Sequence, residues 1–287
     1  RVRSSAASDV YKRQDMDRIV KLLIAQIGFI FLGVILAAIP CFLIMGMDIA
    51  KVYVVVSGLF LGSLLLIWYM LSKKYVRFDS LTWSFHSVKV IILTIMLNVL
   101  FFFFANGLDG LSNFLGYEDL NDNFSILRDL ALNPFGLCVL LFVYPVAEEL
   151  LYQGAILSSL LEKKNLAPKY AILISALIFS IVHPGQNISF FFFGLLWGYL
   201  YYRSGSLGLC ILSNMIMNGI WALLIIYYPD VRSVYEIIGT MPFAGLAVLS
   251  VILSAICIYY LNRSLKVPAW QISENRDSET DSVVINE

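Results

Sequence analysis

Two adjacent carboxylates stand inside an apolar stretch of the chain. Glu148 and Glu149 belong to the segment YPVAEELLYQG, and Gln153 follows Glu149 by four residues, so these two side chains share one helix face. Acidic side chains at membrane depth are costly and are usually kept for a function. A carboxylate held in such surroundings can serve as a general base. The segment therefore predicts acid–base chemistry at these carboxylates.

Two further pairs of residues repeat this spacing in other apolar stretches. Phe179 precedes His183 by four residues, and Asn214 precedes Asn218 by four. Three helices that each present one such face can build a buried polar site. Two interpretations of the asparagines are open. They donate hydrogen bonds to a developing oxyanion, or they join neighbouring helices through amide hydrogen bonds.

The composition is that of a membrane protein. The chain has 287 residues, of which 60% are hydrophobic and only 14% are charged, and its mean hydropathy is +0.81. A soluble domain of this size needs a more polar surface. The formal net charge is zero, which excludes the basic footprint of a nucleic-acid-binding protein. The four cysteines show no C-x-x-C pairing and are interpreted as small buried side chains.

Hydropathy predicts an all-α fold, a polytopic membrane bundle of about eight transmembrane helices, because roughly 20 apolar residues cross a bilayer core. The predicted spans are residues 19–45, 52–71, 88–105, 134–160, 168–184, 188–203, 206–228 and 241–262. The fifth and sixth spans are short enough to form a tight helical hairpin. Placed on this topology, the polar site lies between the membrane midplane and the outer face.

The loop charges predict the orientation of the chain. Lys and Arg gather in alternate loops, so the positive-inside rule places both termini in the cytoplasm, in a membrane that we expect to be the bacterial cytoplasmic membrane. The expected organisation is a non-native or disordered extension at 1–15, helices and an acidic outer loop (from Asp109 to Asp129) within 16–130, a core with the polar site at 131–228, a last transmembrane helix within 229–265, and a disordered polar tail at 266–287.

The three spaced pairs resemble the motifs of a known family. The CAAX prenyl protease and bacteriocin-processing family of intramembrane proteases (the CPBP or Abi family) carries the motifs E-E-x-x-x-R, F-x-x-x-H and H-x-x-x-N. The resemblance covers roughly residues 134–224 and includes Glu148, Glu149, Phe179, His183 and Asn218. Two positions depart from the family pattern. Gln153 replaces the arginine of the first motif, and Asn214 replaces the histidine of the third.

The resemblance implies an intramembrane endopeptidase. Glu148 would activate water for attack on a peptide carbonyl of a membrane-associated peptide or protein, and the lipid bilayer would be the second partner. The implied catalytic set is Glu148, Glu149, His183, Asn214 and Asn218, with Gln153 and Phe179 in support. If the family's site holds a divalent metal such as zinc, Glu148 and His183 are the candidate ligands, and the amide of Asn214 is a poor replacement for a histidine ligand.

Two other functional classes are compatible with the sequence. The chain could be a catalytically impaired relative that acts as a membrane scaffold, a regulator or a bacteriocin self-immunity protein, and the residues at positions 153 and 214 favour this alternative. A transporter component is the third class. Against it stand the compact three-helix cluster and the lack of repeated broken helices.

Overall fold

The computed structural model describes residues 2–45, 47–114, 123–163, 165–183, 187–231 and 233–265. Within these ranges every regular element is helical, which confirms the predicted all-α bundle. The helices are α1 (Val2–Met45), α2 (Met47–Ser72), α3 (Val88–Phe114), α4 (Asn123–Leu132), α8 (Pro168–Val182), α9 (Asn187–Ser204), α10 (Leu207–Tyr227), α11 (Val234–Ile238) and α12 (Thr240–Ser264). One long helix between α4 and α8 combines α5 (Pro134–Cys138), η1 (Val139–Val143), α6 (Tyr144–Glu149), η2 (Leu150–Leu157) and α7 (Ser158–Leu161).

Each of the predicted spans coincides with a helix. Six of these helices in the described ranges are long and apolar enough to cross a membrane, and α8 is a shorter apolar helix. The predicted hairpin of the fifth and sixth spans is formed by α8 and α9, which pack against each other. Gly194 on α9 permits this approach, because a Cβ there would lie 2.9 Å from the backbone of Ala176 on α8.

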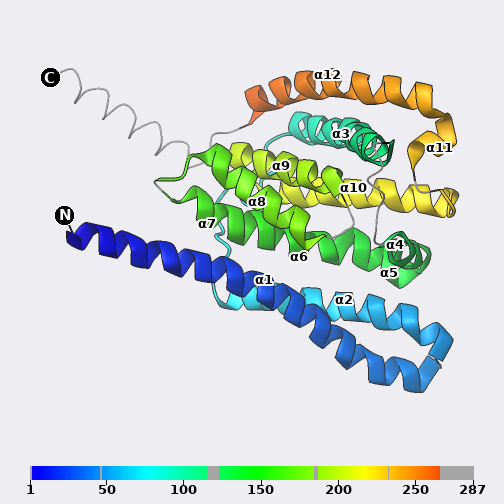
Figure 1. Cartoon of the computed structure of the whole chain (residues 1–287), viewed down its shortest axis with the longest axis horizontal. Coiled ribbons are helices and arrows are strands. Elements are labelled where there is room, and N and C mark those ends of the chain that lie inside the picture. The colour runs from blue at the N-terminus through cyan, green and yellow to red at the C-terminus, as the bar shows by residue number, and fades with distance from the viewer. Residues whose placement is uncertain are drawn as a thin grey trace.

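The helices form three layers (Figure 1). The hairpin of α1 and α2 covers one side of the molecule, and the pair α3 and α12 covers the other. Between them lie the long helix 134–161 and helices α8, α9 and α10. The middle layer holds most of the fully buried residues, among them Leu151, Tyr152 and Leu209. The predicted polar segments therefore sit in the best-protected part of the bundle.

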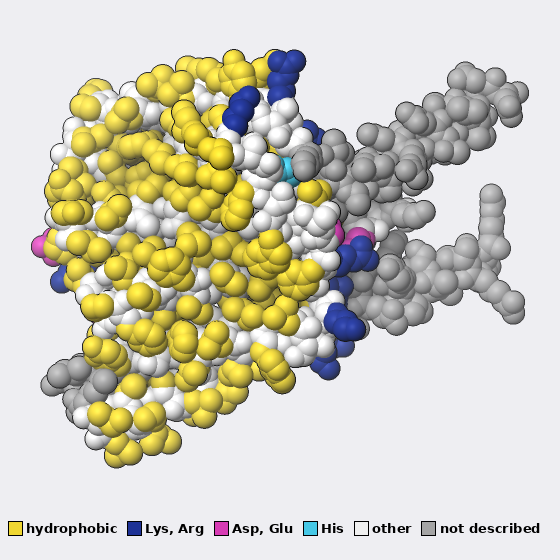
Figure 2. Space-filling view, turned by 180° about the vertical axis from the view of Figure 1, so that it is seen from behind, with side chains coloured by type: hydrophobic (Ala, Val, Ile, Leu, Met, Phe, Trp, Pro, Cys, Tyr) yellow, Lys and Arg dark blue, Asp and Glu magenta, His cyan; other side chains and the backbone are white. Residues whose placement is uncertain are grey.

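The outer surface is apolar over most of the bundle's length (Figure 2). Large hydrophobic side chains on α1 and α12 are exposed, for example Leu43 at 81% and Val248 at 66%. A soluble monomer rarely exposes contiguous apolar surface of this extent, whereas lipid chains solvate it without cost. Lys and Arg side chains gather mainly at one end of the molecule (Figure 2). This distribution of side chains is that of an integral membrane protein.

Two predicted boundaries need correction. The third span was expected to end at residue 105, but α3 continues to Phe114, so the start of the predicted outer loop is helical. Asp109 in this extension accepts a hydrogen bond from the backbone N–H of Ser189 at 3.3 Å, in the first turn of α9. An acidic side chain is favourable at a helix N-terminus, so Asp109 on α3 stabilises the first turn of α9. The end of the same predicted loop forms α4.

The two ends of the chain differ in what the structure describes. Residues 2–15, which were expected to be a non-native or disordered extension, form the first part of α1. The predicted polar tail, residues 266–287, lies outside the described residues.

Candidate active site

The long helix 134–161 carries the two glutamates between two π-helical segments. It begins with Asn133, whose side chain accepts a hydrogen bond from the N–H of Gly136 at 2.9 Å. Pro145 has no N–H to donate, and the preceding Tyr144 N–H reaches back five residues to the carbonyl of Val139. The second π segment ends with the Ser158 N–H bonded to the carbonyl of Gln153. Such wider turns are frequent at functional sites, and they rotate the faces of the helix.

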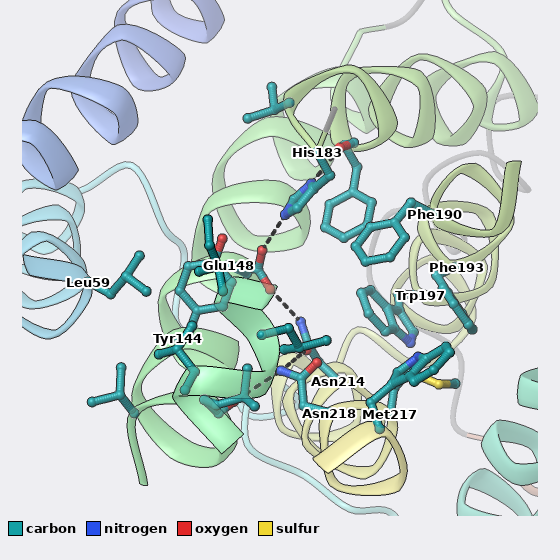
Figure 3. Close-up of a pocket in the computed structure, with 18 residues that line it drawn as sticks. Leu59, Tyr144, Glu148, His183, Phe190, Phe193, Trp197, Asn214, Met217 and Asn218 are labelled. Carbon is teal, nitrogen blue, oxygen red and sulfur yellow. Dashed lines mark hydrogen bonds and ion pairs between the residues drawn. The ribbon is translucent and has the colours of Figure 1, made fainter. Parts of the chain in front are cut away.

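Three helices bring the predicted polar residues together (Figure 3). Glu148 Oε1 lies 2.8 Å from His183 Nε2, and Glu148 Oε2 accepts a hydrogen bond from Asn214 Nδ2 at 3.1 Å. The same amide nitrogen donates to Glu149 Oε1 at 2.9 Å. Glu148, Glu149 and Asn214 are each at most 4% exposed. The structure thus places both acids, the histidine and the first asparagine in one buried cluster.

His183 is held by the backbone one turn earlier in α8. Its Nδ1 lies 2.7 Å from the carbonyl oxygen of Phe179, and a carbonyl can only accept, so Nδ1 carries a hydrogen. The contact between Nε2 and Glu148 Oε1 therefore shares one proton. The Phe179 ring packs against the imidazole with ring centroids 4.5 Å apart. Phe179 therefore positions His183 through both its backbone and its ring.

Asn218 lies one turn beyond Asn214, and its side chain forms hydrogen bonds within the protein. Its Nδ2 donates to the carbonyl of Leu140 at 3.0 Å and to Asn214 Oδ1 at 3.2 Å. A side-chain amide has two N–H hydrogens. Both hydrogens of Asn214 go to the glutamates, and both hydrogens of Asn218 go to these two oxygens. In this arrangement neither asparagine has a hydrogen left for a substrate.

Gln153 occupies the place of the family's arginine without matching its chemistry. The side chain is 1% exposed, and its Oε1 has no hydrogen-bond partner. Glu149 Oε2 is also buried without a partner. An arginine would offer five donors to such oxygens, whereas an amide oxygen can only accept. With glutamine at position 153, two buried acceptors, Glu149 Oε2 and Gln153 Oε1, have no hydrogen-bond donor.

A cavity of about 310 Å³ opens in front of the cluster. Its walls are mostly apolar, and its polar groups come from Tyr144, Glu148, His183, Asn214, Asn218 and Trp197 with Trp221. Leu127 and Leu130 of α4 line it as well. The lining residues come from α2, α4, the long helix 134–161, the end of α8, α9 and α10. His183 lies 14 residues after Lys169 on α8, about 21 Å along the axis, so the cavity is remote from the lysine-rich end of this helix.

Three polar cavity residues escaped prediction from the sequence, namely Tyr144, Trp197 and Trp221. Tyr144 lies one turn before Glu148 and lines the same cavity. Trp197 on α9 is buried, and its Nε1 has no hydrogen-bond partner. The four-residue spacing from Tyr144 to Glu148 was a visible signal, of the same kind as the pairs that were used. Nothing in the sequence distinguished Trp197 from a packing residue.

The donor atoms do not fit the zinc site considered from the resemblance. Among the described residues no group of three or more His, Cys, Asp or Glu side chains is arranged to hold a metal ion. Glu148 and His183 meet at a hydrogen-bond distance, and Asn214 presents N–H hydrogens rather than an oxygen to both glutamates. A zinc ion needs lone pairs from about four ligands. We therefore derive no catalytic step through a metal.

The cluster coincides with a region of recognised similarity. Residues 131–220 match the family model described as type II CAAX prenyl endopeptidase Rce1-like. No match was found among curated proteins or among solved structures. The matched region contains all three polar pairs and the helices that bring them together. The match of residues 131–220 in this integral membrane protein supports the assignment to the CPBP group of intramembrane proteases that the three motifs indicated.

Proposed function

We propose that the protein is an intramembrane endopeptidase in which Glu148 activates water. The observation that carries the proposal is the Glu148 carboxyl itself. It lines the cavity while His183 and Asn214 hold its two oxygens from two other helices. A carboxylate oxygen has two lone pairs, so each oxygen retains an acceptor position beside its present partner. Glu148 can therefore bind a water that faces the cavity.

The reaction follows from this arrangement. Glu148 takes a proton from water while the water oxygen forms a bond to the substrate's peptide carbon, and the carbonyl electrons move to the oxygen as an oxyanion. The C–N bond then breaks, the carbonyl re-forms, and the leaving amine takes the proton from Glu148. His183 steadies the carboxylate through the shared proton. Asn214 keeps Glu148 and Glu149 in place, and for it to act as an oxyanion donor one of its two hydrogen bonds must open.

The cavity supports a substrate with an apolar side chain or segment. Its walls include Phe179, Phe190, Phe193 and Met217, and cavities of this size hold small ligands or one large side chain. We propose that the end rich in Lys and Arg faces the cytoplasm, so that both termini are cytoplasmic and the cavity lies in the opposite half of the bilayer. A membrane-associated peptide or protein could enter from that half.

The decisive experiment is cleavage of a library of membrane peptides by the purified protein in nanodiscs. Cleavage that Glu148→Gln abolishes is the expected result, because the amide cannot accept the water's proton. Glu162→Gln is the matched control, since Glu162 is a surface acid that pairs with Arg77 at 3.1 Å, away from the cavity. Equal cleavage by the Glu148→Gln variant and the wild type would refute the role of Glu148.

A non-catalytic scaffold or immunity function is the second candidate. It is favoured by the two buried oxygens of Glu149 and Gln153 that have no hydrogen-bond donor. In the family motif a positively charged arginine occupies position 153. In the same experiment this candidate predicts no cleavage from any library member. It also predicts that binding of a membrane partner survives the Glu148→Gln change.

A further inference from the structure

The proposed reaction lacks a donor for the oxyanion in the resting cluster. The four amide hydrogens of Asn214 and Asn218 are engaged with protein acceptors. The Nδ1 hydrogen of His183 is bonded to Phe179, and the proton at Nε2 is shared with Glu148. A buried oxyanion without a donor is strongly disfavoured, and one preorganised donor contributes a factor of about 10² to 10³ in rate. Another cavity residue must supply the hydrogen.

Tyr144 has the position and the chemistry for this task. It lines the cavity one helical turn before Glu148, and Figure 3 shows it beside that carboxyl. A phenolic hydrogen turns about a single C–O bond, whereas the hydrogens of an amide are fixed in the amide plane. Tyr144 can therefore redirect its hydrogen to a nearby oxygen while the heavy atoms stay in place.

Trp221 and Trp197 carry the remaining N–H donors of the described cavity lining, and Trp197 is the buried one of the two. Its indole N–H has no partner, but the nitrogen is fully enclosed by neighbouring side chains. The ring is fixed between Phe193, stacked at 5.8 Å, and Phe179, edge-on at 5.5 Å. It stands across the cavity from Glu148 in Figure 3. A donor so enclosed and so remote from the base does not reach the oxygen of a carbonyl attacked beside Glu148.

We propose that Tyr144 is a catalytic residue whose phenol donates a hydrogen bond to the oxyanion formed when water attacks the substrate carbonyl. The inference rests on the proposed endopeptidase function. No proton is transferred from the phenol. As Glu148 takes the water's proton, its carboxyl becomes a weaker acceptor and the substrate oxygen becomes a stronger one, so the hydroxyl of Tyr144 turns its hydrogen toward the substrate oxygen. The family motifs do not include this position.

The test is Tyr144→Phe, measured with the best substrate from the peptide library. The variant keeps the ring and removes only the hydroxyl. We expect kcat to fall by about 10² to 10³ with KM changed less than about threefold, because the donor acts on the transition state and not on the bound substrate. A purely structural role would change KM or the melting temperature instead.

The matched control is Tyr170→Phe, which removes the same hydroxyl from an exposed tyrosine in the first turn of α8, outside the cavity lining. We expect its kcat to stay within about fivefold of the wild type. A Tyr144→Phe variant with near-normal kcat, or a Tyr170→Phe variant with the larger loss, overturns the assignment. The two proposals fail separately. If the wild type cleaves nothing, the endopeptidase function fails, whereas cleavage that needs Glu148 but not Tyr144 refutes only this inference.

Discussion

Asn214 should contribute far more to stability than an ordinary buried amide, because it bonds two acids at once. Its Nδ2 donates to Glu148 at 3.1 Å and to Glu149 at 2.9 Å, and all three side chains are buried. A hydrogen bond to a charged group contributes about 1.5–3 kcal/mol. Loss of both in Asn214→Ala should therefore lower the free energy of unfolding by about 3–6 kcal/mol. An interhelical hydrogen bond in a membrane protein averages only about 0.6 kcal/mol.

Asn98 provides the matched control. It is also a buried asparagine, and its Nδ2 donates to Ser213 Oγ at 3.0 Å and to the carbonyl of Thr94 at 2.8 Å. Both acceptors are neutral, at about 0.5–1.5 kcal/mol each, so Asn98→Ala should cost about 1–3 kcal/mol. The volume removed is the same in both variants. The difference of about 2–3 kcal/mol isolates the contribution of the two glutamates.

The assay is reversible denaturant unfolding of both variants in the same lipid or detergent, extended to a double-mutant cycle of Asn214→Ala with Glu149→Gln. We expect a coupling energy of about 1.5–3 kcal/mol. Equal losses for the two asparagines, or a coupling near zero, would show that Asn214 is an ordinary packing amide. This result would also remove the reason for treating it as the residue that positions the acids.

Three further predictions follow from the same contacts. Gln153→Arg should raise the melting temperature, because the guanidinium supplies donors to the unpartnered Glu149 Oε2; a lower melting temperature would show that the surrounding core cannot accept the larger side chain. Chelators should leave the cleavage rate within about twofold of the untreated rate, and the total metal content is measured on the same sample. A loss of activity that zinc restores would contradict the conclusion that the donor atoms do not fit a zinc site. Gly194→Val should separate α8 from α9, displace His183 and lower the free energy of unfolding by about 1–3 kcal/mol. Gly245→Val on α12, where a Cβ meets open space, is the control in the same unfolding measurement.

The sequence by itself determined the class of the protein, the positions of its helices and the members of its polar cluster. Hydropathy is a local property of the chain, so the eight predicted spans fell on helices with errors mainly at their ends. The third span was ended too early, at 105 rather than at Phe114, because residues after 105 are less apolar and Asp109 appeared to belong to a loop. The polar residues were visible because Glu148, His183 and Asn214 are rare types within apolar stretches.

Only the tertiary structure decided how these residues meet. The rotation and crossing of helices depend on packing between distant segments, and the two π segments around Glu148 and Glu149 change the faces that a regular period of 3.6 residues predicts. The sequence therefore could not show that Asn214 bonds both acids or that Asn218 turns to Leu140. Nor could it place Tyr144 and Trp197 in the cavity wall, because aromatic residues inside a membrane bundle look alike until their neighbours are known.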